Sequence, residues 1–366
     1  MKIMMIESRG QGGVCHYTHN LCNALTGVTK DITLITSKNY ELDGLRKKFR
    51  IEKLFDANYP FDIIRVFRYL MEEKPEIIHF QMLRAPLVDW VFIRSLKSFS
   101  RSKLIYTAHN VIPHHQKLYT KFLLSKIYSL MDNIIVHTKG DERELIDAFE
   151  LSKPKISTIP HGNYVSPVDG HAPSREEARK ELGIPSDIKT VLFFGYISEN
   201  KGLRYLIEAF KDVVKKVPSK LVIAGKPVED FSTYESLISK LGITKDVILN
   251  LDYIPFDEVG HYFMSADVVV LPYVKPYHSV IAQAAHSFGK PVIVTGSSEV
   301  VVDGKSGYVV RPKSSAAIED AVVKILSDDE MRAEMGCYAK KQAEANSWDK
   351  VAEKTMKVYF QKKDGE

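Results

Sequence analysis

Short apolar segments alternate with longer, helix-like segments along almost the whole chain. The apolar segments are mostly continuous, which is typical of strands buried on both faces of a parallel sheet. Between them, apolar residues recur every three or four positions, as in residues 201–217 and 315–328, and predict amphipathic helices. Twelve strands are expected: residues 2–8, 32–37, 76–81, 103–109, 133–138 and 155–160 in the first half, and 190–196, 220–225, 247–253, 268–273, 291–296 and 307–312 in the second.

This alternation predicts an α/β protein with two Rossmann-like, doubly wound parallel-sheet domains facing a central cleft. A chain of 366 residues is also longer than one hydrophobic core usually supports. A Pro-, Gly- and Ser-containing stretch suggests where the domains separate. We expect an N-terminal domain over residues 1–163, a linker with a short helix over 164–187, a C-terminal domain over 188–345 and a final helix over 346–366.

The final helix is basic and amphipathic, with Trp348, Val351, Met356 and Tyr359 as its apolar positions. On this pattern alone it could cap the second domain.

Charge is distributed unevenly between the two halves of the chain. Residues 1–165 hold 24 Lys and Arg against 17 Asp and Glu, whereas the remainder holds 27 against 29. Basic clusters lie at residues 45–50 and 94–103. They form either an ordinary solvated surface or a face that meets anionic lipid headgroups or a phosphate-bearing acceptor. Nucleic acid is not expected as a partner, because no recognised binding module or aromatic-interleaved basic stripe is present.

The cysteine pattern indicates a reducing compartment. Cys15 and Cys22 would lie on one helix with Cα atoms about 10 Å apart, too far for a disulfide. Together with Cys337 they make an odd, unpaired set. The first residues lack the apolar core of a signal peptide, and no apolar run approaches the ~20 residues that span a bilayer. We therefore expect a cytoplasmic protein, at most peripheral to the inner face of a membrane.

Two segments of the first half could contribute to a ligand site. Gly10, Gly12 and Gly13 follow the first strand and permit a tight turn into a helix whose first amides are free to bind an anion or a sugar oxygen. The dinucleotide-binding spacing is absent, so a plain strand-to-helix turn explains this segment equally well. His109 lies at the carboxyl end of a strand, where doubly wound sheets bind ligands. His114 and His115 follow it, but their spacing matches no zinc pattern.

The second half contains a stronger signal for an anion site. A buried strand ends at Gly195, a polar loop follows, and Lys201 with Gly202 opens a long helix, an arrangement that suits a diphosphate. Ser279 is a plausible N-cap of a short helix that Gly289 ends. The free amides at the start of that helix would form a second anion site opposite Lys201.

The ordered motifs of the chain resemble those of GT-B glycosyltransferases, specifically family 4 of the retaining, nucleotide-sugar-dependent enzymes. The resemblance spans nearly the whole chain and is most specific in the second half. It also implies that the final helix returns to pack on the first domain. The segments that carry it are GGVCHYTHNLCNAL, TAHN, IIVHTKGDERELI, TIPHG, FFGYISENKGLRYLIEAF, LVIAG, YIPFDEVGHYFMSADVVVLPY, AAHSFGKPVIVTGSSEVVVDGKSGYVV and SWDKVAEKTMKVY.

The resemblance implies roles for individual residues. His109 matches a histidine near the transferred sugar, Lys201 the lysine that binds the donor diphosphate, and Gly13 the glycine loop that approaches the phosphates or the acceptor. His109 and Lys201 are the expected catalytic residues. The residues expected to bind the donor are Gly12, Gly13, Gly195, Tyr196, Lys201, Gly225, Lys226, Tyr253, Ile254, Lys275, His278, Ser279, Val280 and Gln283, with the base near Gly225–Pro227 and the backbone of Tyr253–Ile254.

The sequence departs from the family pattern at three of these positions. Tyr196 replaces a common arginine, while Lys275 and Gln283 replace two glutamates that contact the donor sugar and the ribose. Gln283 retains a carbonyl that can accept a hydrogen bond from a ribose hydroxyl. Lys275 reverses the charge beside the sugar, which would suit an acidic donor sugar such as a uronic acid, or an acceptor phosphate.

The resemblance implies transfer with retention, in which the departing diphosphate deprotonates the acceptor hydroxyl. The enzyme would supply positive potential for the developing phosphate charge. No Asp-x-Asp motif is present, so neither a metal nor another cofactor is expected. The acceptor would be a polysaccharide, a lipid-linked oligosaccharide or another glycoconjugate. Two alternatives remain open: a catalytically degenerate nucleotide-sugar binding or regulatory subunit, which the altered acids favour, and a nucleotide-sugar epimerase of the same fold.

Overall fold

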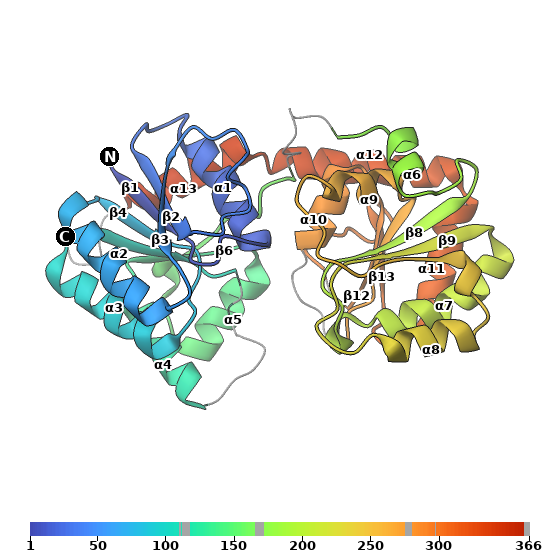
Figure 1. Ribbon diagram of the computed structural model, residues 1–366, viewed down its shortest axis with the longest axis horizontal. Helices are drawn as coiled ribbons and strands as arrows, with labels where there is room; N and C mark the ends of the chain where they lie inside the picture. The colour runs from blue at the N-terminus through green and yellow to red at the C-terminus, as the bar shows by residue number, and fades with distance from the viewer. Residues whose placement is uncertain (110, 112–117, 165–171, 275–279, 297, 362–366) are drawn as a thin grey trace. The chain divides into compact units, whose positions relative to one another are not determined.

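The chain forms two compact α/β units in the computed structural model (Figure 1), which describes residues 1–109, 111, 118–164, 172–274, 280–296 and 298–361. Unit 1 comprises Met1–Gly162 together with Asn346–Glu366, and unit 2 comprises Asn163–Ala345. Each unit is built on one parallel sheet with helices on both faces. The predicted doubly wound α/β fold is therefore confirmed.

Unit 1 contains a seven-stranded sheet in the order β3-β2-β1-β4-β5-β6-β7, in which every neighbouring pair is parallel. The central strands are buried over their whole length, as their continuous apolar sequences predict. The strands are β1 (Ile3–Ile6), β2 (Ile32–Ser37), β3 (Arg50–Phe55), β4 (Ile77–Phe80), β5 (Lys103–Thr107), β6 (Asn133–Val136) and β7 (Ile156–Thr158).

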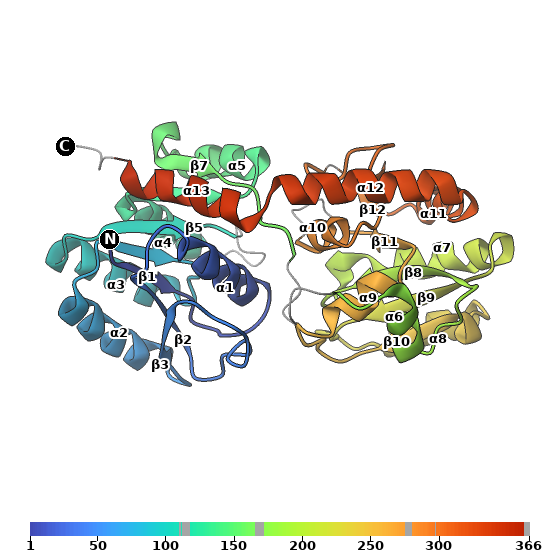
Figure 2. The same cartoon turned by 90° about the horizontal axis from the view of Figure 1, so that it is seen from above.

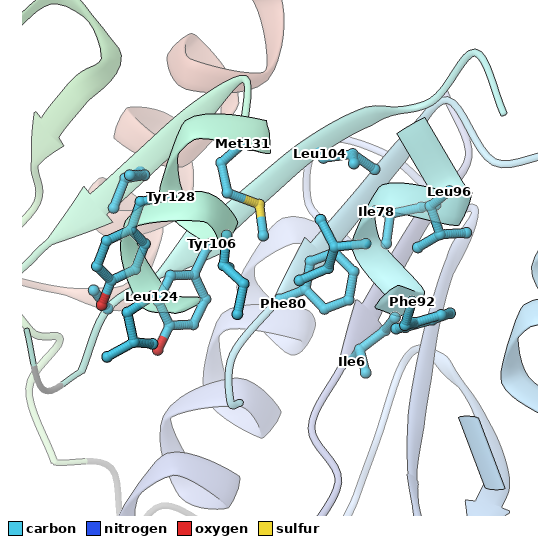
Figure 3. Packing of buried hydrophobic residues seen from close by; sticks show 14 of the residues in the cluster. Ile6, Ile78, Phe80, Phe92, Leu96, Leu104, Tyr106, Leu124, Tyr128 and Met131 are labelled. Atoms are coloured by element: carbon cyan, nitrogen blue, oxygen red, sulfur yellow. The ribbon is translucent and has the colours of Figure 1, made fainter. Parts of the chain in front are cut away.

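The helices of unit 1 cover both faces of its sheet. One face carries four helices because the crossovers from β3 through to β7 all run in the same direction. Side chains from these helices meet alternate strand residues such as Ile78 and Phe80 in one large core (Figure 3). These helices are α2 (Tyr59–Glu73), α3 (Pro86–Phe99), α4 (Leu118–Leu130) and α5 (Lys139–Phe149).

Two helices from opposite ends of the chain cover the other face. Helix α1 (Gly13–Leu25) packs against α13 (Trp348–Phe360), as Figure 2 shows. The phenol oxygen of Tyr359 lies 2.7 Å from Nδ1 of His79, a β4 residue whose side chain points away from the α2–α5 core. All four predicted apolar positions of the last helix are buried.

Unit 2 contains a six-stranded parallel sheet in the order β10-β9-β8-β11-β12-β13. One apolar core lies beneath α7, α8 and α11, and a second lies beneath α9 and α10 on the opposite face. The strands are β8 (Lys189–Phe194), β9 (Ser219–Ala224), β10 (Val247–Asn250), β11 (Val268–Leu271), β12 (Val292–Thr295) and β13 (Gly307–Val310). The helices are α6 (Arg175–Glu181), α7 (Leu203–Lys216), α8 (Ser232–Lys240), α9 (Val259–Ser265), α10 (Val280–Ser287), α11 (Ser315–Ser327) and α12 (Asp329–Ala345).

All twelve strands expected from the sequence are present, each within a few residues of its predicted bounds. The sequence prediction missed β3, which lies at the edge of the first sheet and is largely half-exposed. The three cysteines are free thiols, as expected from their spacing. Among the described residues, no helix is both long enough and apolar enough to cross a lipid bilayer.

Candidate functional site

Each sheet has one point at which the direction of strand addition reverses. This switch point lies between β1 and β4 in unit 1 and between β8 and β11 in unit 2. Doubly wound sheets bind ligands beyond the carboxyl ends of their strands, next to the switch point.

In unit 1, two buried or half-buried carboxylates hold the glycine loop after β1. Glu7 accepts hydrogen bonds from the backbone N–H groups of Arg9 (2.9 Å) and Gly10 (2.8 Å). Glu41 accepts from the Gly12 N–H (2.7 Å) and lies 2.5 Å from Nε2 of His16. Gly12 precedes α1 with a φ of 81°, and Gly13 is the first residue of that helix. The loop is thus a hydrogen-bonded turn at the switch point, consistent with the tight turn predicted from Gly12 and Gly13.

A histidine follows each of three consecutive strands of unit 1, and the three side chains meet. His109 follows β5, His137 follows β6 and His161 follows β7. The ring centroids of His109 and His137 are 4.9 Å apart, and those of His137 and His161 are 5.4 Å apart. Burial lowers the pKa of His161 to about 4 and that of His109 well below its usual range. His109 and His161 are therefore neutral near pH 7.

Hydrogen bonds connect His109 to both of its neighbouring strands. Its Nε2 lies 3.0 Å from Oε1 of Gln81, which follows β4, and its Nδ1 lies 3.0 Å from Nε2 of His137. Nδ1 of His137 lies 3.1 Å from the Ile159 carbonyl oxygen, which can only accept. Contacts at both ring nitrogens therefore hold His109 between the ends of β4 and β6.

Tyr17 of α1 connects the glycine loop to the histidine cluster. Its ring makes edge contacts with His109, His137 and His161, at centroid distances of 4.7, 5.1 and 4.9 Å, and with Trp348 of α13 at 5.1 Å. Its buried hydroxyl has no hydrogen-bond partner among the described residues. Within the same part of the chain, no three His, Cys, Asp or Glu side chains are grouped as metal ligands.

In unit 2, the predicted glycines bring the ends of β8 and β9 into close contact. A β-carbon on Gly225 would overlap the carbonyl oxygen of Gly195, so the two backbones require glycine at this position. Beyond them, the half-exposed rings of Tyr196 and Tyr253 lie 6.4 Å apart. The exposed Lys226 accepts a backbone hydrogen bond from Ile197 (3.0 Å), whereas Ile254 is buried in the core.

Lys201 lies at the switch point of the second sheet. It belongs to a 3-10 turn, Glu199–Lys201, and Gly202 separates it from α7, so it precedes the helix that it was expected to open. Its Nζ lies 4.3 Å from the ring centroid of Tyr273, just beyond β11, a cation–π contact. The Val274 N–H donates to the Asn200 carbonyl (2.9 Å) and ties this turn to the end of β11.

Burial lowers the pKa of Lys201 to about 8. The ammonium ion is therefore poorly solvated in the free protein, although most of the side chain is protonated at pH 7. An anion beside it would restore favourable interactions to the charged form. A lysine with such a shifted pKa is typical of a ligand-binding or active site.

We expect Gly202→Ala to disrupt the Lys201 turn. Gly202 has a φ of 66°, and an added β-carbon would overlap the Pro272 carbonyl oxygen. Gly242 is a matched control, because its φ is 69° but no atom lies within 4 Å of an added β-carbon. Gly242→Ala should cost only the left-handed strain, about 1–2 kcal/mol. Urea unfolding should show a larger loss for Gly202→Ala. Equal losses for the two variants would contradict the steric argument.

Helix α10 lies beside the β8 end of the sheet. Ile281, one residue into the helix, would be 3.9 Å from a β-carbon on Gly195. Val280 is exposed, whereas Gln283 is buried and its amide nitrogen has no hydrogen-bond partner among the described residues. Gly289 has a φ of 65° and ends the helix, as predicted. Lys275, His278 and Ser279, with His114 and His115 of unit 1, lie outside the described residues.

The structure thus assembles the expected residues into two groups. In unit 1, Tyr17 connects the helix after the glycine loop to His109. In unit 2, Gly195 contacts Gly225 and Tyr196 contacts Tyr253, whereas Lys201 contacts Tyr273 beyond the neighbouring strand β11. Sequence reasoning missed His137, His161 and Tyr273. The two histidines could have been found by the rule that selected His109, since each lies at or just after the carboxyl end of a predicted strand. Tyr273 carried no comparable signal, because it reads as the last residue of an apolar strand.

Two family models together match most of the chain, in order. Residues 11–163 match the model described as "Glycosyltransferase Family 4", and residues 174–342 match "Glycosyl transferases group 1". A D-inositol 3-phosphate glycosyltransferase of Corynebacterium urealyticum is 26% identical over 305 residues, which cover 78% of this chain and 71% of that protein. An uncharacterized glycosyltransferase of Methanocaldococcus jannaschii is 32% identical over 233 residues, covering 62% and 59%.

Solved structures share the fold over nearly the full length. HepE from Anabaena, in complex with UDP and glucose, aligns with a TM-score of 0.80 at 17% identity, covering 98% of this chain and 99% of that one. WaaG, a glycosyltransferase involved in lipopolysaccharide biosynthesis, aligns with a TM-score of 0.73 at 15% identity, covering 98% and 100%. At these identities the likeness establishes the fold. Together with the two family matches, it shows that the chain belongs to the GT-B glycosyltransferases of family 4.

Proposed function

We propose that this glycosyltransferase moves a sugar from a nucleotide diphosphate sugar to a hydroxyl group of a glycan, a lipid-linked saccharide or another acceptor, with retention of anomeric configuration and without a metal ion. Polysaccharide or glycolipid synthesis is the corresponding cellular role, at the cytoplasmic side of a membrane. The observation that carries the proposal is the setting of Lys201, a desolvated ammonium ion at the switch point of the second sheet.

The chemistry of the second unit suits a diphosphate. A desolvated lysine attracts an anion more strongly than a solvated lysine does, because less water screens the two charges. The exposed face of the Tyr196 and Tyr253 pair offers an aromatic surface for the nucleoside. The unpartnered amide nitrogen of Gln283 can donate a hydrogen bond to a donor oxygen. HepE was crystallised with UDP and with UDP-glucose, which supports a uridine diphosphate sugar as the first donor to test.

In the proposed reaction, the bond between the anomeric carbon and the diphosphate oxygen breaks as the acceptor oxygen bonds to the same face of the sugar. The acceptor proton passes to the leaving diphosphate. Lys201 stabilises the negative charge that develops on that diphosphate, a contribution that is larger in the transition state than in the ground state. His109, held neutral by burial, serves as a hydrogen-bonding group and not as a general acid.

A thermal-shift panel of UDP-, GDP-, ADP- and dTDP-sugars tests the donor class, because a ligand of the folded state raises the apparent melting temperature. Donor hydrolysis without acceptor then tests catalysis. We expect one nucleotide to stabilise the protein and its sugar to be slowly released as the retained anomer. Stabilisation without any turnover would favour a binding or regulatory subunit. Conversion of the donor to its epimer would favour the epimerase, and an absence of stabilisation by every nucleotide would refute the proposed donor site.

Nucleotide affinity should depend on pH through Lys201. The protonated lysine binds the diphosphate, and its pKa in the free protein is about 8. Affinity should therefore be constant below pH 8 and fall above it, by up to about tenfold per pH unit, while binding takes up a proton. Calorimetry in buffers of different ionisation enthalpy measures both effects. Lys201→Met should bind weakly and lose this pH dependence. A wild-type affinity that does not change between pH 7 and 9.5 would contradict the assignment.

A further inference from the structure

Three neighbouring helices of unit 1 carry a concentration of exposed apolar side chains. Of the fourteen large hydrophobic side chains that are exposed among the described residues, seven lie on α2, α3 and α4. These helices pack side by side over one face of the sheet (Figure 1). Six of the seven occupy the first two turns of their helices, and only Phe99 lies at a helix end. The six are Phe61 and Ile64 on α2, Leu87 and Val91 on α3, and Tyr119 and Phe122 on α4.

The starts of these helices lie along one edge of the sheet. Helices α2, α3 and α4 follow β3, β4 and β5, and those strands are parallel. Each helix therefore begins at the carboxyl edge of the sheet. His109 also lies at that edge, because it follows β5. The exposed apolar residues thus border the same edge of unit 1 as the histidine cluster.

Exposed cations accompany the apolar residues on all three helices. Arg68, Arg94, Lys121 and Lys126 have no carboxylate partner among the described residues. Helix α4 contains no acidic residue at all. Its Lys126 Nζ lies 5.3 Å from the ring centroid of Phe122, and the Arg94 guanidinium carbon lies 5.9 Å from that of Trp90.

Of the four carboxylates on these helices, only Glu72 is exposed without a cation partner among the described residues, so it offsets at most one of the four positive charges. Asp62 and Asp89 are buried and accept hydrogen bonds from within the unit. Glu73 pairs with Lys2. The two basic clusters predicted from the sequence are each partly paired: Lys47 with Asp43 and Arg50 with Asp31 in residues 45–50, and Lys97 with Asp132 in residues 94–103, of which Arg94 belongs to this face. Positive potential therefore remains on the face of α2, α3 and α4, which we call the basic apolar face.

We infer that the basic apolar face docks unit 1 onto an anionic lipid bilayer. Apolar side chains at the helix starts would enter the headgroup region, while the long side chains of Arg68, Arg94, Lys121 and Lys126 would reach lipid phosphates. Charge argues against a second copy of the chain as the occupant, because its identical face would bring like charges together. The inference does not depend on the proposed reaction. It would place the His109 edge of the sheet next to the bilayer surface.

Vesicle co-sedimentation tests this inference. Wild-type protein should bind vesicles of phosphatidylcholine mixed with phosphatidylglycerol, bind phosphatidylcholine alone much less, and dissociate as salt is raised. Phe122→Ser combined with Lys126→Gln should lower binding about tenfold, since each cation near the surface contributes about fivefold and the aromatic ring adds to it. The matched control combines Val28→Ser with Lys30→Gln, because both residues are exposed on unit 1 outside this face. The control should bind like the wild type.

Other outcomes would overturn the inference. If the two double variants lost vesicle binding equally, or if binding did not depend on lipid charge, the basic apolar face would not be the determinant of membrane binding. A dimer in solution that the Phe122 and Lys126 variant dissociates would assign the face to a second copy instead. Thermal stabilisation by nucleotide, measured on the same variants, should stay at the wild-type level. That measurement separates a failure of membrane docking from a failure of the proposed donor site.

Discussion

Replacing Lys201 with methionine or alanine is expected to lower the rate of sugar transfer about a hundredfold or more, the effect of losing one preorganised charge contact in a transition state. The loss should appear mainly in kcat, because the diphosphate gains charge as the glycosidic bond breaks. Methionine keeps most of the volume over the Tyr273 ring and removes only the charge. Initial rates with saturating donor and acceptor provide the measurement.

Stability separates this catalytic effect from damage to the fold. A desolvated ammonium ion is unfavourable in the free protein, since burial lowers the pKa of Lys201. Lys201→Met should therefore leave the free energy of unfolding equal or higher, even as activity falls. Lys215→Met is a suitable control, because Lys215 lies on α7 of the same unit and pairs with Asp212 at the surface. Near-normal transfer by Lys201→Met, or an equal loss in the control, would exclude the proposed role of Lys201.

The buried strands could be predicted because their sequences reflect their environment. A strand covered on both faces is largely apolar, as in β1, β4, β6, β11 and β12, where every residue is buried. Strand β3 differs because it lies at the sheet edge and three of its six residues are charged, in RIEKLF. Its first residue, Arg50, belongs to a basic cluster, and a search for apolar segments therefore missed the strand. In the folded unit, Arg50 pairs with Asp31 and Lys53 pairs with Asp43, so ion pairs offset part of this charge.

Candidate ligand-binding residues were predictable where strand ends determine their position. His109 and Gly195 follow strands, and doubly wound parallel sheets bind ligands beyond the carboxyl ends of their strands, next to the switch point. What the sequence could not show is how residues from different segments meet. His137 contacts His109 across 28 residues, and Trp348 of the last helix contacts Tyr17 of the first. Lys201 looked like a helix-start lysine, and only the fold shows that it lies on the Tyr273 ring.

A second buried charge cluster lies at the opposite, amino end of the second sheet. Asp267, directly before β11, is 2% exposed and accepts from Nη2 of Arg175 (2.8 Å) and Nη2 of Arg179 (3.0 Å). It also accepts from the Thr190 N–H of β8 (2.8 Å), and Nε of Arg332 lies 3.5 Å away. One carboxylate thus joins α6, α12 and two strands. Burial and neighbouring Arg175 lower the pKa of Arg179, whereas the Asp267 carboxylate acts in the opposite direction and favours the charged guanidinium.

Asp267→Asn is expected to destabilise unit 2 by about 3–5 kcal/mol, because it leaves the buried Arg179 guanidinium without its counter-ion. Asp212→Asn is the matched control, since Asp212 pairs with Lys215 at the surface and its loss should cost less than about 1 kcal/mol. Hydrogen exchange measured by mass spectrometry can follow each unit separately. Peptides from β8, including the Thr190 amide, should exchange much faster in Asp267→Asn, whereas peptides from β4 and β5 of unit 1 should not change. If Asp267→Asn were as stable as Asp212→Asn, the cluster would contribute no more to stability than a surface ion pair. The hydrogen bonds of Arg179 to backbone carbonyls would then have to stabilise its charge alone.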